Sequence, residues 1–363
     1  MLTRRVFLAA GGLALTGLGV MAALSPGQPE ALRDDMGRVW GGSLSEKVFV
    51  QINGIRQGMI IQSADQTHPI LLFLHGGPGM PEFFLNTTHP SALEQDFTVV
   101  WWEQRGAGIS FNAKIAPDTM TLAQLINDTI AVTRYLLRRF GKEKIYLLGH
   151  SWGSYLGLQV AAAAPDLFNA YIGMGQVSWQ LRSEVAAHAY MLGQYRVRND
   201  LAMVRKLEAA RVSMATGLSP AYLALRDQAM HGLGVGTTRD MTSVISGVFV
   251  PVWLCRAYTL REKVNIWRGL AFSRGLLWDD FLATDLTTRV LALNLPVYFF
   301  TGLQDFTANH DLARAYFDLI KAPVKGFYTF DHSAHSPLFE EPERARDILM
   351  QDVLRTENRL ADG

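Results

Sequence analysis

The chain has 363 residues, and its 34 lysines and arginines nearly balance 33 aspartates and glutamates, for a formal net charge of +1. Hydrophobic residues make up 49% and charged residues 18%, which excludes disordered, collagen-like and strongly basic nucleic-acid-binding chains. We therefore expect one large folded domain, or a core with an added piece, and no nucleic-acid partner.

The N-terminus has the form of an export leader. Residues 6–24 contain no charged residue and follow Arg4 and Arg5, as in signals that join a basic head to an apolar stretch. The arginine pair resembles the twin-arginine signal that bacterial export machinery reads as an address. We predict an export signal over residues 1–24, cleaved after Ala22, and a location in the periplasm or outside the cell. The alternative is an inner-membrane anchor over residues 6–24, since a span needs about 17 to 25 residues.

After a linker over residues 25–44, patterns typical of strands begin. Asn53-Gly54 lies between two apolar runs and predicts the tight turn of an antiparallel hairpin. Short runs that are almost continuously apolar predict strands covered on both faces, as in a parallel sheet. These runs span residues 70–74, 97–102, 145–148, 170–174, 296–301 and 327–330.

Helical patterns alternate with these strands, which implies right-handed crossovers and an open, mostly parallel α/β sheet flanked by helices. The patterns span residues 121–140, 152–164, 310–321 and 342–357. Residues 177–291 interrupt the alternation, and they favour helices over 181–195, 200–215 and 259–270. We predict an α/β core over residues 45–176 and 292–358, with an inserted helical cap over residues 177–291.

One serine has the surroundings of a nucleophile. Gly149-His-Ser151-Trp-Gly153 follows a predicted strand and precedes a predicted helix. The flanking glycines allow a strained turn that exposes the serine, and the N-terminus of the helix favours developing negative charge. A second loop, His75-Gly-Gly-Pro-Gly79, also follows a strand. It is either a simple turn or a loop whose N–H groups bind a carbonyl oxygen together with the N–H of Trp152.

A serine nucleophile needs a base, and the base needs an acid to orient it. Asp305 and His335 each follow a predicted strand. The chain order Ser151, Asp305, His335 is the order expected when all three lie at the C-terminal edge of one sheet. His332 in place of His335, and Asp331 in place of Asp305, remain alternatives.

Two further histidines are expected to have other roles. His150, next to the serine, is expected to pack below the turn. His310 opens a predicted helix as a cap or surface residue.

Together these motifs resemble the α/β-hydrolase superfamily, and specifically its proline iminopeptidase-like branch of serine peptidases. The resemblance covers residues 45–355. It is carried by His75-Gly-Gly-Pro-Gly79, Glu103-Gln-Arg-Gly106-Ala-Gly108, Gly149-His-Ser-Trp-Gly153, Asp305 and Ser333-Ala-His335-Ser-Pro337. In that family the glycine matching Gly77 and the tryptophan matching Trp152 supply the amides of the oxyanion hole.

Two positions differ from the family pattern or match it weakly. Glu103 stands where members commonly have aspartate, which affects the expected geometry of its loop. Family members bind the free amino group of the substrate through carboxylates of the cap. Glu184 is our candidate for this role and Glu208 a weaker one, and either could instead be a solvated helix residue.

The expected chemistry is acyl transfer through a covalent intermediate on Ser151. The resemblance implies an aminopeptidase that releases N-terminal proline or small apolar residues from a small peptide. A carboxylesterase or lactonase is the alternative, and a ligand receptor on the same fold is a distant one. The sequence implies no metal or organic cofactor, and the single cysteine, Cys255, is expected to be a buried, inert thiol.

Overall fold

The computed structural model describes residues 23–34 and 36–362. The predicted export signal, up to its cleavage site after Ala22, therefore lies outside the described residues. In the part of the chain that is described, no helix is long and apolar enough to cross a membrane.

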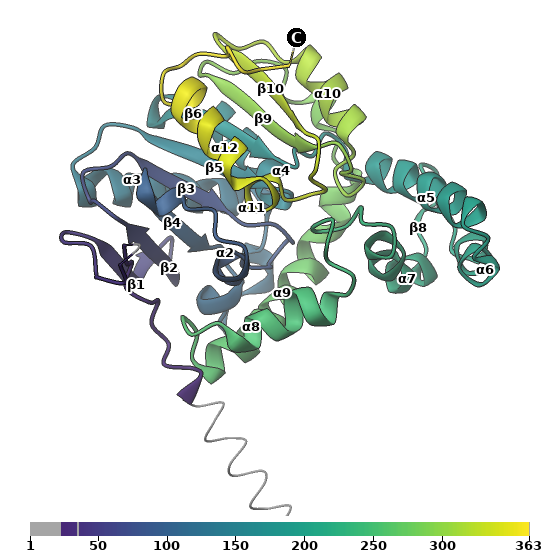
Figure 1. Ribbon diagram of the computed structural model, residues 1–363, viewed down its shortest axis with the longest axis horizontal. Coiled ribbons are helices and arrows are strands. Elements are labelled where there is room, and N and C mark those ends of the chain that lie inside the picture. Colours follow the sequence, from purple (N-terminus) through teal and green to yellow (C-terminus); the bar gives the residue numbers. More distant parts are fainter. Residues whose placement is uncertain (1–22, 35, 363) are drawn as a thin grey trace, which may run out of the picture.

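An eight-stranded sheet forms the centre of the molecule (Figure 1). The first two strand pairs, β1–β2 and β2–β4, are antiparallel, and the other five pairs are parallel. This confirms the predicted open, mostly parallel sheet. In spatial order the strands are β1 (Leu44–Ile52), β2 (Ile55–Ser63), β4 (Thr98–Glu103), β3 (Ile70–Leu74), β5 (Ile145–His150), β6 (Phe168–Met174), β9 (Val297–Gly302) and β10 (Lys325–Phe330).

The predicted hairpin joins β1 and β2. Ile52 pairs with Ile55 across the turn, and the two turn residues have positive φ angles, 43° at Asn53 and 85° at Gly54. Asparagine and glycine are the residues that adopt this backbone most easily, so the local sequence determines the turn.

Helices cover both faces of the sheet because successive strand residues are buried on opposite sides. Leu72 and Leu74 pack in one apolar cluster with α3 (Leu122–Phe140), α4 (Trp152–Ala163) and α10 (His310–Leu319). Leu71 and Phe73 pack in a second cluster. Its helices are α2 (Phe83–Thr88), α11 (Pro337–Glu340) and α12 (Pro342–Ile348).

The ends of α3 follow from its sequence. The Thr121 hydroxyl accepts a hydrogen bond from the Gln124 N–H at 3.2 Å, and Gly141 ends the helix with a φ of 63°. At the other end of the chain, the pattern over residues 342–357 continues beyond α12 as a π-helical turn, Leu349–Val353.

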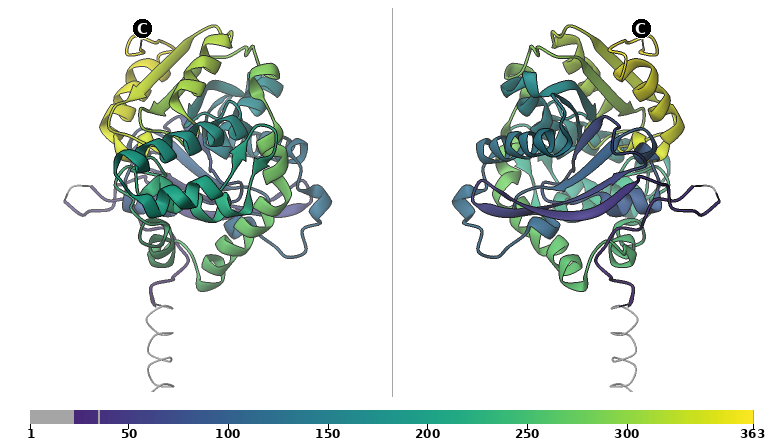
Figure 2. Two further views of the ribbon diagram at one scale, coloured as in Figure 1. Left: turned by 90° about the vertical axis from the view of Figure 1, so that its right-hand side faces the viewer. Right: turned by 90° about the vertical axis from the view of Figure 1, so that its left-hand side faces the viewer.

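The segment between β6 and β9 is mainly helical. It contains α5 (Gln180–Val197), α6 (Leu201–Ala209), α7 (Pro220–His231), α8 (Val250–Leu254) and α9 (Leu260–Ala283). Seen from the side in Figure 2, left, these helices lie in front of the sheet. The first three share a small apolar cluster of their own that includes Met191, Leu207 and Tyr222, whereas α9 packs on the core.

Two helix predictions in this segment were wrong in extent. The helix expected over residues 200–215 ends at Ala209 and is followed by a short antiparallel pair, β7 (Val212–Ser213) and β8 (Gly217–Leu218). The helix stops because Ala210, with a φ of −90° and a ψ of 76°, has left the helical conformation. The helix expected over residues 259–270 runs on to Ala283, because Leu277 and Phe281 give it a further buried face on the core.

Candidate active site

Ser151 occupies a sharp turn between β5 and α4. Its φ of 56° and ψ of −120° are unusual for a residue with a side chain. The flanking glycines make this turn possible. A Cβ on Gly149 would lie 2.2 Å from the Gly153 carbonyl oxygen, and a Cβ on Gly153 would lie 1.9 Å from the Leu74 carbonyl oxygen. The motif therefore reflects close backbone packing as well as exposure of the serine.

Asp305 and His335 are brought together at the C-terminal edge of the sheet. His335 Nδ1 lies 2.8 Å from Asp305 Oδ2. The other carboxylate oxygen, Oδ1, accepts hydrogen bonds of 2.9 Å from the N–H groups of Thr307 and Ala308. Asp305 is fully buried, so its charge is held by fixed donors and orients the imidazole.

The opposite ring nitrogen of His335, Nε2, is buried and has no hydrogen-bond partner in the described part of the chain. Ser151 lies on the neighbouring strand end, where its N–H donates to the Met174 carbonyl at 3.0 Å. Gly175 follows Met174 in the chain, and a Cβ on Gly175 would lie 2.8 Å from the His335 ring. The structure thus brings the serine turn and the imidazole side by side, without a hydrogen bond from the Ser151 hydroxyl to His335.

The alternative acid, Asp331, and the alternative base, His332, are not part of the Asp305–His335 pair. Both Asp331 and His332 are exposed. The His332 N–H donates to Glu341 Oε1 at 2.9 Å, and neither of the two side chains is bonded to Asp305 or His335 in the described residues.

The backbone N–H groups of Gly77 and Trp152, in the glycine loop and directly after the serine, have no hydrogen-bond acceptor among the described residues. Gly77 has a φ of 120°, and a Cβ there would lie 2.4 Å from the Gly79 nitrogen, so only glycine fits. Trp152 is the first residue of α4, where an N–H has no partner within the helix. Neither N–H makes a hydrogen bond to any described residue. Both are thus free to bind an oxygen atom of a substrate.

A buried carboxylate that the sequence analysis missed connects the loops around the site. Glu82 Oε1 accepts from the Gly76 N–H at 2.9 Å, and Oε2 lies 2.8 Å from His150 Nδ1. His150 Nε2 in turn lies 2.9 Å from the carbonyl oxygen of His335. Burial disfavours protonation of His150, but Glu82, the His335 carbonyl and the charge of Asp305 together raise the pKa of His150. His150 is buried, as expected, and it also joins the glycine loop to the His335 loop.

Gln104 belongs to the Glu103–Gly108 motif, but the sequence analysis gave it no role of its own. Its side-chain oxygen accepts from the Trp152 indole N–H at 2.9 Å. Its amide nitrogen donates to the His75 carbonyl at 2.9 Å, and its backbone N–H donates to His75 Nε2 at 3.1 Å. Gln104 therefore ties the first residue of α4 to the glycine loop. Burial lowers the pKa of His75, in keeping with its role as an acceptor.

Glu340 holds the loop that carries His335. Its carboxylate accepts hydrogen bonds from the N–H groups of Ala334, Ser336 and Arg239, at 2.8–3.1 Å. Burial raises the pKa of Glu340 to about 7. The contact with Arg239 also fastens the loop after α7 to the His335 loop, and the His335 N–H donates to Gly236 in the same segment.

Glu103 closes its loop despite being longer than the aspartate of the family pattern. One carboxylate oxygen accepts from the Ile109 N–H and the other accepts from the Tyr258 hydroxyl at 2.7 Å. Burial raises the pKa of Glu103 to about 7. The residue thus links the loop after β4 to the start of α9.

We expect Glu103→Gln to flatten the dependence of thermal stability on pH between about 4.5 and 7. Because the pKa of Glu103 is raised from 4.5 on folding, the folded protein binds this proton more tightly than the unfolded chain. Its contribution is fully present below pH 4.5 and is lost as the pH rises through about 7. Glutamine does not titrate: its oxygen can accept from the Ile109 N–H, while its NH2 group can donate to the Tyr258 oxygen. Melting temperatures of variant and parent across this pH range measure the effect.

Exposed Glu143 supplies the control for this experiment. Glu143→Gln should leave the pH profile unchanged, and Glu103→Gln should retain the part of the slope that comes from Glu340. Equal profiles for Glu103→Gln and the parent protein would contradict the assignment.

Glu184 is not a solvated helix residue. It is fully buried on α5, and its carboxylate accepts from Arg226 Nε at 2.8 and 2.9 Å, from the Tyr222 hydroxyl at 2.8 Å and from Gln180 Nε2 at 2.8 Å. Glu208, the weaker candidate, is half exposed on α6 and pairs with Arg196 at 2.7 Å. Only Glu184 therefore has the burial expected of a binding group, and its charge is already matched by Arg226.

The described residues contain no group of three or more histidine, cysteine, aspartate or glutamate side chains that could hold a metal ion. Cys255 is buried as predicted. Burial raises its thiol pKa to about 11, which keeps the thiol protonated and unreactive at neutral pH.

Comparison with known proteins agrees with this fold. The family model for the alpha/beta hydrolase fold matches residues 69–342, and the chain belongs to this family. It is 34% identical over 301 residues to the Probable aminopeptidase YbaC of Bacillus subtilis (strain 168), covering 81% of this chain and 91% of that protein.

Two proteins named proline iminopeptidase are also similar to this chain, one in sequence and one in structure. Identity to the Proline iminopeptidase of Lactobacillus delbrueckii subsp. lactis is 23% over 304 residues, covering 80% of this chain and 91% of the relative. The crystal structure of Proline iminopeptidase from Mycobacterium smegmatis superposes with a TM-score of 0.63 at 19% identity, covering 85% of this chain and 98% of that one. This structural likeness concerns the fold.

Proposed function

We propose that the protein is a serine hydrolase in which Ser151 is the nucleophile, His335 the base and Asp305 the acid that orients it. Ser151 Oγ forms a bond to the substrate carbonyl carbon while its proton passes to His335 Nε2. The amides of Gly77 and Trp152 stabilise the oxyanion. Return of the proton to the leaving amine breaks the amide bond, and water then releases the acid from the serine by the same steps.

One observation carries this proposal: the hydrogen bond between His335 and Asp305 lies beside the strained serine turn, and it leaves His335 Nε2 unpartnered. A neutral imidazole bonded to a carboxylate through Nδ1 presents a lone pair at Nε2, which is the form that a general base needs. A ligand receptor would not require this arrangement.

For the substrate we propose a peptide with a free N-terminal proline or small apolar residue. The names of the relatives, an aminopeptidase and proline iminopeptidases, support this choice. Glu184 is our candidate for the substrate's amino group. Both of its oxygens are occupied by Arg226, Tyr222 and Gln180, so this role requires one of these donors to move. Ester hydrolysis remains the second candidate, because the same acyl-enzyme chemistry serves both substrates.

A panel of proline, alanine and leucine arylamides against short p-nitrophenyl esters tests the substrate class. We expect hydrolysis of the arylamides with a free amino group, and loss of activity when that amino group is acetylated. Glu184→Gln should raise KM for the free arylamides by about tenfold and leave the esters unaffected, as expected for one lost charged contact. Activity confined to the esters would remove the peptidase assignment.

We also propose that the chain is exported. This rests on the leader alone, since residues 1–22 lie outside the described structure.

A further inference from the structure

An apolar surface is exposed beside the start of α9. We call it the apolar patch, and it consists of Ile245, Phe249, Val250 and Leu254, which are 69, 45, 42 and 54% exposed. The patch lies on the π-helical turn Ile245–Phe249 and on α8. No charged residue occurs between Asp240 and Arg256. Large apolar side chains gathered on one helical surface mark an interaction site more often than an ordinary solvated face.

The described chain begins next to this patch. Lys263 Nζ donates to the carbonyl oxygens of Leu24 and Trp253, at 3.2 and 2.6 Å, and to the Ser25 hydroxyl at 2.8 Å. The Gly27 N–H donates to the Arg256 carbonyl at 3.1 Å. Figure 1 accordingly shows the start of the described chain beside α8. The uncharged sequence that ends at Leu24 therefore joins the folded protein at the border of the patch.

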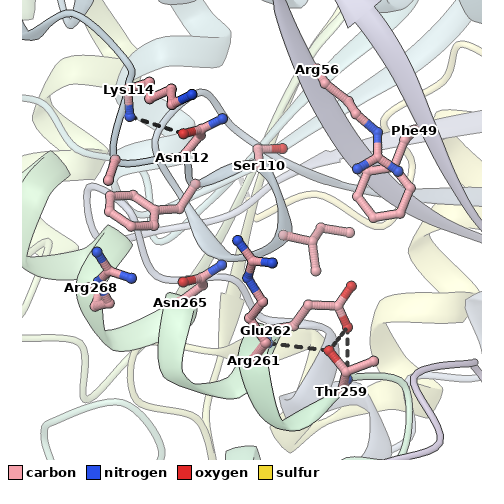
Figure 3. Close-up of a pocket in the computed structure, with 13 residues that line it drawn as sticks. Phe49, Arg56, Ser110, Asn112, Lys114, Thr259, Arg261, Glu262, Asn265 and Arg268 are labelled. Carbon is pink, nitrogen blue, oxygen red and sulfur yellow. Dashed lines mark hydrogen bonds between the residues drawn. The ribbon is translucent and has the colours of Figure 1, made fainter.

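Cations lie on the adjoining surface. A cavity of about 480 Å³ opens between α9, the β1–β2 hairpin and the loop after β4. Arg56, Arg261, Arg268 and Lys114 line it (Figure 3). None of the four has an ion-pair partner among the described residues. Ser151 is not among the residues that line this cavity.

Aromatic rings hold two of these cations in place. The Arg56 guanidinium lies 3.6 Å from the centre of the Phe49 ring, and that of Arg268 lies 5.1 Å from the centre of the Phe111 ring. Such stacking orients a guanidinium while leaving its N–H groups free to bind an anion. Thr259, which also lines the cavity, packs closely against Gly27. The first described residues thus contact both Thr259, which lines the cavity, and Arg256, which follows the patch in the chain.

We propose that this side of the molecule docks on the surface of an anionic lipid bilayer. The apolar patch enters the boundary between headgroups and acyl chains, and the four cations bind lipid phosphates. A helical surface with exposed apolar side chains, joined to unpaired arginines, is the arrangement that interfacial membrane-binding segments use. This choice of partner rests on the proposed export: a leader that directs export brings its chain to a membrane, so the junction with the leader favours a bilayer over a second protein.

Site-specific quenching in vesicles tests this docking. The full chain carries one cysteine, Cys255, which is 3% exposed, so an environment-sensitive thiol probe can be placed at Phe249→Cys. The control is Val197→Cys at the end of α5, where the side chain is 83% exposed. Both proteins are bound to mixed vesicles of phosphatidylcholine and phosphatidylglycerol that contain lipids with brominated acyl chains. Both should retain the parent's hydrolytic activity.

We expect the bromolipids to quench the probe at position 249 by about twofold or more, and the probe at position 197 not at all. Vesicles without phosphatidylglycerol, or Arg261→Gln with Arg268→Gln, should weaken the quenching at position 249. If the bromolipids quench neither probe, the folded protein does not enter the bilayer, only the leader attaches it to the vesicle, and the docking is refuted. If the probe at position 249 becomes buried in detergent as protein concentration rises, the patch instead binds a second copy. If quenching at position 249 is the same without phosphatidylglycerol, and the same in the Arg261→Gln, Arg268→Gln variant, the proposed role of the cations is refuted.

Discussion

Ser151→Ala is expected to lower kcat/KM by about a millionfold and to abolish labelling by a fluorophosphonate probe. The proposed mechanism has no other group that can form the covalent intermediate, and removing the nucleophile of a comparable catalytic unit has an effect of about this size. Single-turnover assays on the best substrate of the panel, together with mass spectrometry of the labelled protein, measure both effects. The variant should fold normally, since Ser151 makes its hydrogen bonds in the fold through its backbone.

The chain offers matched controls for each member of the proposed catalytic unit. Asp305→Asn should lower kcat by about four orders of magnitude, because the amide no longer favours the reactive tautomer of His335. Asp331→Asn, at the exposed aspartate, should leave kcat unchanged. His335→Ala and His332→Ala form the corresponding pair. Labelling that persists in Ser151→Ala, or a loss of activity in Asp331→Asn as large as in Asp305→Asn, would refute the assignment.

Asp128→Ala is expected to destabilise the protein more than any surface substitution, by about 3–5 kcal/mol. Asp128 is fully buried on α3 and pairs with Arg105, with Nε to Oδ2 at 2.7 Å and Nη2 to Oδ1 at 3.1 Å. Its oxygens also accept from the side-chain amides of Asn53, Gln57 and Gln124, at 2.7–2.8 Å. Removing the carboxylate leaves a buried guanidinium and three amides without their acceptor.

Thermal and denaturant unfolding measure this loss, which corresponds to a fall in melting temperature of roughly 10 °C for a domain of this size. Asp118→Ala, at an exposed aspartate in the turn before α3, should change the free energy of unfolding by less than about 0.5 kcal/mol. Combining Asp128→Leu with Arg105→Met should cost less than Asp128→Ala alone, because no buried charge is then unpaired. An equal or larger loss in the double variant would show that packing, not charge, dominates at this position.

The fold and the position of the serine were predictable because their signals are local. Apolar runs bounded by turn residues marked six strands, and glycines two residues on either side marked the turn at Ser151. Asp305 and His335 follow from the order of strands along the chain, since parallel strands bring their C-terminal ends to one edge. Gly77 came from the resemblance to a family, whereas Trp152 was also indicated by its position directly after the serine. Neither N–H is hydrogen-bonded to a described residue.

The groups that support the site could not be predicted in the same way. Nothing in the sequence around Glu82, Gln104 and Glu340 indicates their roles, because a polar side chain has the same neighbours in the chain whether it is solvated or buried. Their partners come from distant segments. Glu82 meets His150 across 68 positions, and Gln104 meets Trp152 across 48.

The sequence by itself determined the α/β class, the hairpin at Asn53-Gly54, the burial of Cys255 and the serine turn, because each depends on the conformational preference or polarity of neighbouring residues. Only the tertiary structure placed His335, and not His332, against Asp305, and showed that Glu184 is buried and not solvated. A carboxylate's environment depends on which groups pack around it. For Glu184 the matching charge, Arg226, lies on another helix 42 positions further along the chain.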